Sequence, residues 1–201
     1  MGIEWNTLIA NYLNLDVETG ASRGAMLSLI GSQVQNAIEN AIGRSMVPVT
    51  YGDTGDQPAQ WYDGTGKPTL YLYQDPIISV EDVQVYGASL TLRSPLTGTY
   101  NDGKSVTWNT HKLMRIDGGV FPCGLTTKVS YTAGYSPDST DGSALINAAL
   151  IWATLIYNEA PRLGLTLSQA GGQQTTYTHA IPDEVKLLLT QFRKPLKWRQ
   201  T

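Results

Sequence analysis

The apolar residues of this chain repeat with a helical period near both ends and with a period of two in between. Near the start, one stripe recurs at every fourth position: Met26, Ile30, Val34, Ile38 and Ile42. From Val47 to Tyr51 the apolar residues alternate instead, and residues 144–157 are apolar nearly all round. A period near 3.6 indicates a helix and a period of two a strand, so the pattern predicts helices flanking an inserted β region.

The predicted helices cover residues 4–15, 22–42, 143–160 and 182–194. Ser22 is a favoured N-cap, Gly43 and Pro161 are stop signals, and Pro182 suits a first helical position. The fold class follows as α+β, mainly helical: a helix bundle of two N-terminal helices, one long central helix and one C-terminal helix, with an inserted small antiparallel β region. We expect a single domain over 1–201, divided into 1–43, 44–135, 143–194 with a flexible loop at 163–180, and a tail at 195–201.

Turn residues divide the β region into short strands. Residues 60–62 and 69–73 flank Asp63-Gly64-Thr65-Gly66 and predict a β-hairpin. Residues 77–86 predict one kinked strand. Further strand-like segments follow at 90–92, 105–108, 112–116 and 128–135.

The charge balance limits the classes of partner. Charged residues make up 15% of the 201 residues, below the usual quarter, and the net charge is −3. A protein that held DNA by its phosphates would carry a basic excess, so we do not expect a dedicated DNA binder. The single cysteine, Cys123, excludes an intramolecular disulfide. With no secretory pattern at the N-terminus and no long apolar span, we expect a soluble intracellular protein.

No recognisable catalytic constellation is present. His111 and His179 lie in separate polar stretches without a metal-ligand spacing. The four Asp-Gly pairs at 63, 102, 117 and 141 lack a calcium-loop ladder and predict turns. There is no phosphate loop and no serine elbow. We therefore predict no catalytic, cofactor or metal site, and a protein that is not an enzyme.

Several short stretches follow one another in an order that is more specific than any of them alone. They are Ile38-Glu39-Asn40-Ala41-Ile42-Gly43-Arg44, Trp61-Tyr62-Asp63-Gly64, Leu70-Tyr71-Leu72, Asp75-Pro76-Ile77-Ile78-Ser79-Val80 and Val129-Ser130-Tyr131-Thr132-Ala133-Gly134-Tyr135.

Together these stretches resemble the phage head–tail connector (adaptor) family. The first is similar to the family's second-helix ending, the next three to its hairpin and proline-led strand, and the last to the strand before its long helix. The resemblance covers most of the chain. Segment 88–127 is longer than a minimal member needs, so it receives no role by resemblance.

The resemblance implies a structural virion protein that forms a ring of about twelve copies beneath the portal. Such a ring joins the DNA-filled capsid to the tail and lines the DNA exit channel. The implied partners are other copies of the chain, the portal, the next neck or tail-completion protein and, transiently, passing double-stranded DNA, with no membrane. The implied location is the head–tail neck of a virion assembled in the host cytoplasm.

The C-terminal segment carries the predicted partner-binding residues. From residue 186 onward there are five basic residues and no acidic one, whereas the first twenty residues carry three acidic residues and no basic one. Ends of opposite sign favour head-to-tail contacts, and a tryptophan among the charges is a typical interface anchor. The predicted portal-binding or partner-binding set is Lys186, Arg193, Lys194, Leu196, Lys197, Trp198 and Arg199.

Other interpretations stay open. The terminal charges can be merely solvated, or can contact DNA. A tail-completion or stopper ring of the neck is an alternative function. The eleven tyrosines and five tryptophans also allow a monomeric aromatic-rich ligand-binding module, although their spread along the chain favours core and interface use.

Overall fold

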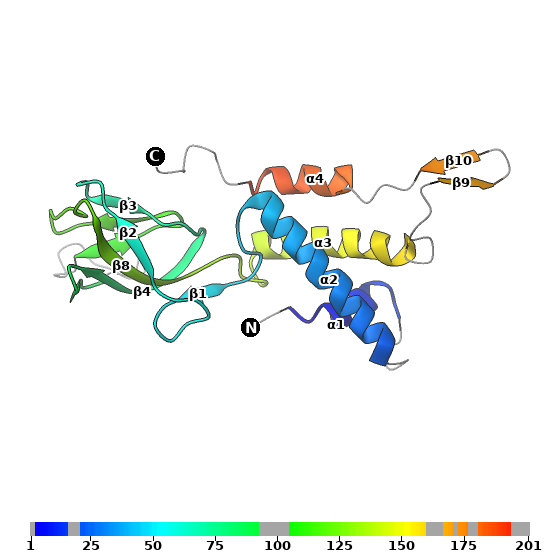
Figure 1. Ribbon diagram of the computed structural model, residues 1–201, viewed down its shortest axis with the longest axis horizontal. Helices are drawn as coiled ribbons and strands as arrows, with labels where there is room; N and C mark the ends of the chain where they lie inside the picture. The colour runs from blue at the N-terminus through cyan, green and yellow to red at the C-terminus, as the bar shows by residue number, and fades with distance from the viewer. Residues whose placement is uncertain are drawn as a thin grey trace. The chain divides into compact units, whose positions relative to one another are not determined.

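The structure is a computed structural model, and it describes residues 3–15, 21–92, 105–159, 167–170, 173–176 and 181–193. The chain is α+β and divides into two compact units (Figure 1). The β unit comprises Arg44–Ser139. The helical unit combines the residues before it, up to Gly43, with those after it, from Thr140 to α4.

Four helices lie in the described part of the helical unit, and they confirm the four that the sequence predicts. They are α1 (Trp5–Tyr12), α2 (Ala21–Ile42), α3 (Thr140–Glu159) and α4 (Asp183–Thr190). Helix α2 packs against the other three, and α3 also packs against α1 and α4. Four members of the apolar stripe of α2 face this core, as their period predicts: Ile30, Val34, Ile38 and Ile42. Met26, the first member of the stripe, is instead exposed. Buried side chains from all four helices include Ile9, Leu27, Val34, Ile38, Ile42, Leu145, Ala149, Trp152, Val185 and Leu189.

A glycine allows α1 to approach α2 closely. Trp5 is 4% exposed and lies against Gly31, where an added Cβ would overlap the Trp5 side chain. The indole Nε1 donates a hydrogen bond of 2.9 Å to Gln35 Oε1, so the buried N–H group is satisfied. Helix α2 also contains Gly24, around which there is open space.

The described residues of the β unit form two antiparallel sheets. In the larger sheet β8 (Leu125–Ala133) pairs with β1, β2 and β4, and β4 also pairs with β5. These partners are β1 (Val49–Tyr51), β2 (Gln60–Asp63), β4 (Ile77–Val85) and β5 (Ala88–Ser89). The smaller sheet has the order β3 (Thr69–Tyr71), β7 (Lys112–Arg115) and β6 (Val106–Trp108).

The two sheets share one hydrophobic core. Strand β8 buries alternate residues, among them Val129 and Tyr131, as period two requires. Leu70 and Leu113 of the smaller sheet belong to the same buried cluster, as does Phe121. The expectation of a mainly helical bundle is not confirmed, because this β region has a substantial core of its own.

The predicted hairpin between residues 60–62 and 69–73 is wrong. Strand β2 pairs with β8, and β3 pairs with β7, so the two strands lie in different sheets. Gly64 lies so close to the carbonyl groups of Phe121 and Pro122 that a Cβ would overlap them. The glycine therefore allows the chain to pass from one sheet to the other, where we had expected a hairpin turn. One strand over this segment is confirmed, and the pairing of β4 with β8 shifts register twice, between Ile77 and Ser79 and between Val80 and Asp82, as a kinked strand does.

Two further expectations need correction. Segment 163–180, expected as a flexible loop, contains an antiparallel hairpin of β9 (Leu167–Ala170) and β10 (Gln173–Thr176). Asp141-Gly142, expected as a turn, lies in the first turn of α3. A carboxylate there is favoured by the positive end of the helix dipole. No helix in the described part of the chain is long and apolar enough to span a membrane.

The two glycines of α2 give a matched test of the α1–α2 contact. We expect Gly31→Ala to lower the free energy of unfolding by about 1–3 kcal/mol, because Trp5 must move. Gly24→Ala should instead raise it by about 0.5–1 kcal/mol, because alanine is the better helix former. Urea unfolding followed by far-UV circular dichroism measures both, and equal effects would contradict the close approach.

Candidate functional site

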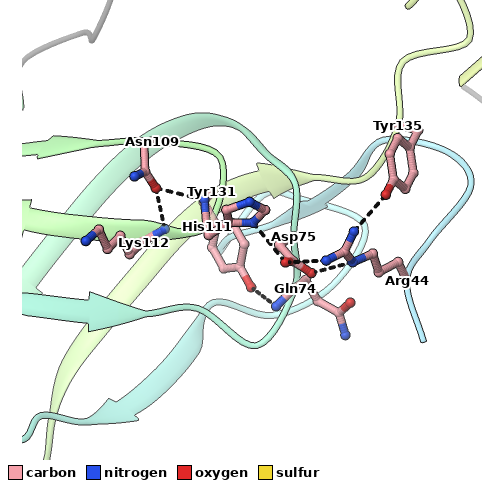
Figure 2. Close-up of polar contacts among 8 residues, drawn as sticks. All are labelled: Arg44, Gln74, Asp75, Asn109, His111, Lys112, Tyr131 and Tyr135. Atoms are coloured by element: carbon pink, nitrogen blue, oxygen red, sulfur yellow. Dashed lines mark hydrogen bonds and ion pairs between the residues drawn. The ribbon is translucent and has the colours of Figure 1, made fainter. Parts of the chain in front are cut away.

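One polar site of the β unit is centred on Asp75, in the connection between β3 and β4. Asp75 is 2% exposed, so its charge must be compensated inside the protein. Arg44 provides this by a two-pronged contact, with Nε 2.9 Å from Oδ1 and Nη2 3.0 Å from Oδ2 (Figure 2). A guanidinium fork matches a carboxylate in this geometry.

Two further side chains complete this cluster. His111 Nδ1 lies 3.0 Å from Oδ2 of Asp75, and Arg44 Nη1 donates to the Tyr135 hydroxyl at 2.9 Å (Figure 2). We call Arg44, Asp75, His111 and Tyr135 the Asp75 cluster. Arg44 directly follows α2, and Tyr135 lies between β8 and α3. The cluster therefore joins the points where the chain enters and leaves the β unit.

Sequence reasoning missed the Asp75 cluster. His111 was assigned to a polar stretch, and 36 residues separate it from Asp75. One signal was present, since Arg44 and Asp75 both belong to the stretches that carry the family resemblance. In the structure both carboxylate oxygens of Asp75 contact guanidinium or imidazole nitrogens of neighbouring side chains. Asp75 therefore has a structural role.

A second polar network lies beside the first. The hydroxyl groups of Tyr62 and Tyr131 are 3.0 Å apart, and both donate to Gln60 Oε1. The backbone N–H groups of Tyr73 and Gln74, next to Asp75, donate to these hydroxyls at 3.0 and 3.3 Å. We call Gln60, Tyr62 and Tyr131 the tyrosine network; it satisfies polar groups within the core.

Burial sets the protonation of this network. Burial raises the pKa of the Tyr62 hydroxyl far above its ordinary value of 10, and the nearby Tyr131 raises it further. Burial likewise raises the pKa of Tyr131. Both groups therefore stay neutral and can donate hydrogen bonds throughout the range where proteins are stable. By contrast, the hydrogen bond from Arg115 lowers the pKa of the surface residue Asp117 to about 2.

The structure places two of the predicted partner-binding residues on or beside α4. Lys186 is half exposed and pairs with Asp183 at 2.8 Å, and its ammonium lowers the pKa of that carboxyl. Arg193 is exposed just after the helix. The neighbouring Leu187 is 73% exposed. The other predicted residues, Lys194, Leu196, Lys197, Trp198 and Arg199, lie outside the described residues.

Metal-binding side chains do not gather within the part of the chain that the structure describes. Over that part, no group of three or more histidine, cysteine, aspartate or glutamate residues could hold a metal ion.

Comparisons with known proteins identify solved structures that share the fold of this chain. No family model and no curated protein matches the sequence. A chain from the neck of an empty gene transfer agent (GTA) particle computed with C6 symmetry is similar in structure, with a TM-score of 0.50 and 16% identity. The match covers 97% of this chain and 94% of that one. A chain from the virion of a native GTA particle matches with a TM-score of 0.51 and 16% identity, over 94% of this chain and 89% of that one.

These matches extend over nearly the whole length of both chains. At this identity they establish a shared fold. The resemblance to a phage neck or adaptor protein, stated from short stretches of sequence, is confirmed at that level.

Removing one member of the Asp75 cluster should strongly destabilise the β unit. We expect Asp75→Ala to lower the free energy of unfolding by about 3 kcal/mol, because Arg44 then stays buried without its counter-ion. Asp53→Ala is the matched control, since Asp53 pairs with Lys128 at 2.8 Å but is 74% exposed. The control should lose less than about 1 kcal/mol. Urea unfolding compares the two, and similar losses would contradict the structural role of the cluster.

The tyrosine network predicts sensitivity to alkali. The folded pKa is raised, so its stabilisation is complete below the unfolded value near 10 and is lost as the pH rises above it. The expected loss is about 1.4 kcal/mol per buried tyrosine for each pH unit above 10. Urea midpoints between pH 9 and 11 measure it. Tyr62→Phe should flatten the dependence, whereas Tyr86→Phe, at a 71% exposed position, should leave it unchanged.

Proposed function

We propose that this chain is a head–tail connector (adaptor) subunit, a structural virion protein that forms a ring beneath the portal. The observation that carries the proposal is the shared fold, over nearly the full length of both chains, with a chain from the neck of a GTA particle. That neck was computed with C6 symmetry, which suits a ring of repeated subunits. A ring of about twelve copies fits the same symmetry.

The polar sites support a structural role. The Asp75 cluster consists of groups that neutralise or hydrogen-bond one another, and the tyrosine network holds neutral hydroxyls inside a core. Neither arrangement pairs a nucleophile with a base, as a site of nucleophilic catalysis requires. We therefore infer a protein that works through contact with its partners and not by catalysis.

Contact with the portal is assigned to α4 and the tail that follows it. Lys186 and Arg193 provide exposed positive charge there, and Leu187 provides exposed apolar area. The sequence continues with Lys194, Lys197 and Arg199 around Leu196 and Trp198. Basic residues around an aromatic anchor suit a partner surface with acidic rims.

The weak overall charge suits a channel through which DNA passes. With a net charge of −3, the chain has no excess of basic residues to neutralise phosphates and displace the counterions of DNA, so DNA is not retained. The ring would line the exit channel in the virion neck, with only transient DNA contacts. The next neck or tail-completion protein would bind the ring on its other side.

Deleting residues 195–201 tests the portal contact. We expect the portal affinity to fall at least tenfold, because the tryptophan anchor and two basic residues, Lys197 and Arg199, are lost. The deletion should leave the fold intact, as judged by circular dichroism. Biolayer interferometry with immobilised portal at two salt concentrations measures the affinity and its electrostatic part.

Two matched variants sharpen the result. Trp198→Ala removes the anchor and keeps the charge, and Lys112→Gln removes one positive charge from the β unit. The first should weaken portal binding and the second should not. Unchanged affinity after the deletion would refute the tail assignment. A chain that binds the next neck protein but not the portal would instead be a stopper-type subunit.

A further inference from the structure

The outer face of α2 is free of charge. Its exposed residues recur along one stripe of the helix: Ala25, Met26, Leu29, Ser32, Gln33, Asn36 and Asn40. We call these seven residues the α2 face. Leu29 is 59% exposed and Met26 is 38% exposed. When the sequence is wound at 3.6 residues per turn, the half-buried Glu39 lies at the edge of this stripe and the exposed Arg23 lies on another side of the helix.

The outer side of α3 has the same character. Its outward stripe contains Ser143, Ala144, Asn147, Ile151, Leu155 and Asn158, which are exposed or half-buried. We call these six residues the α3 face. The charged residues of this helix, Asp141 and Glu159, lie beside the stripe. Each face extends over sixteen residues, 25–40 and 143–158, or about 22 Å at 1.5 Å per residue.

This absence of charge is unusual for helix faces that meet water. About a quarter of residues in a soluble protein are charged, and charged residues normally occupy the solvent side of a helix. Helix α4 of the same unit follows the rule, with Asp183, Glu184 and Lys186 among its eight residues. Depletion of charge with retained amides and apolar side chains is instead typical of the centre of a protein interface.

The two faces point away from each other. Helices α2 and α3 pack against each other (Figure 1). Their buried side chains include Val34 and Ile38 on α2 and Leu145 and Ala149 on α3. The exposed stripe of each helix lies opposite its buried stripe. The helical unit therefore presents one neutral face on each of two sides.

We propose that the α2 face of one copy packs against the α3 face of the next copy, so that subunits join head to tail. The inference rests on the proposed ring and specifies which surfaces build it. The faces match in length and in chemistry: Met26 and Leu29 can meet Ile151 and Leu155. The amides on both faces can donate to and accept from one another.

A second copy fits these faces better than other partners do. Neither face has a charge to pair with DNA phosphates or with a basic tail. A two-fold contact would use one face twice and leave the other uncovered, whereas a heterologous contact covers both and propagates into a ring. Two unlike neutral faces on opposite sides of one unit are what such a ring needs.

Cysteine cross-linking tests this pairing directly. Cys123 is exposed and is first replaced by serine. Gln33→Cys and Asn147→Cys then place single thiols within about one helical turn of the middle of each face, where they meet whichever way the helices run. A flexible bismaleimide is applied to the purified full-length protein. An equal mixture of the two variants should give covalent dimers, and the double variant should give a ladder of higher multimers.

Ser89→Cys, at an exposed site of the β unit, is the matched control. Each single variant alone should cross-link no more than this control, because the contact joins unlike faces. A mixture that cross-links no better than the control overturns the proposal, and so does a single variant that dimerises as strongly as the mixture.

Added charge gives an independent readout. We expect Asn36→Glu together with Asn147→Glu to weaken self-association in sedimentation velocity at least tenfold, because like charges would face each other. Ser89→Glu should have no effect, and an unchanged sedimentation profile of the Asn36→Glu/Asn147→Glu variant overturns the proposal.

Portal binding, measured in parallel, separates the two ideas. A chain that binds the portal without cross-linking through these positions overturns the face assignment alone. A chain that cross-links as expected but is not recruited to the portal supports the faces and overturns the connector assignment.

Discussion

The β unit must begin and end at the same place, because it is inserted between two helices that pack on each other. Helix α2 leads into it and α3 follows it, and these helices are in contact. Pairing of β1 with β8 meets this requirement by placing Val49 opposite Ala133. Gly134, with φ of +122°, allows the returning strand to pass against the Val47 carbonyl. The Arg44–Tyr135 hydrogen bond then ties the two connections together.

The Asp75 cluster explains how this closure becomes specific. A buried ion pair gains little net stability, since desolvation offsets most of the attraction. Burying one of these charges without its partner would cost several kcal/mol, however. Only a fold that brings Arg44 to Asp75 avoids this cost. Asp75 precedes β4, and β4 pairs with β8 from Ile77 to Val85. A single carboxylate thus couples the end of α2, the start of β4 and, through Arg44, the exit from β8.

Periodicity found the elements of this fold but not their partners. The four helices and most strands could be predicted because burial imposes a period on each segment by itself. Pairing could not, because alternation shows which side of a strand is buried and not which strand lies beside it. Gln60 pairs with Val129, far along the chain, so the local hairpin was the wrong choice. The Asp75 cluster could not be predicted for the same reason, because its residues are far apart in the sequence. Two of the seven predicted partner-binding residues, Lys186 and Arg193, could be located in the structure.

Charge placement separates two kinds of surface in the proposed assembly. The α2 and α3 faces are neutral, so contact between them depends little on salt. A contact between two single helices about 22 Å long buries less area than the roughly 800 Å² per partner of a stable interface. Copies would therefore associate only weakly in solution. In the proposed assembly the basic tail would act differently, because it would attach each copy to a portal that presents many sites around one axis. Tethering raises the local concentration of neighbouring faces into the range where weak contacts form. Closed rings would then form chiefly on the portal, although the weak contact is sufficient for covalent capture of neighbouring copies in solution.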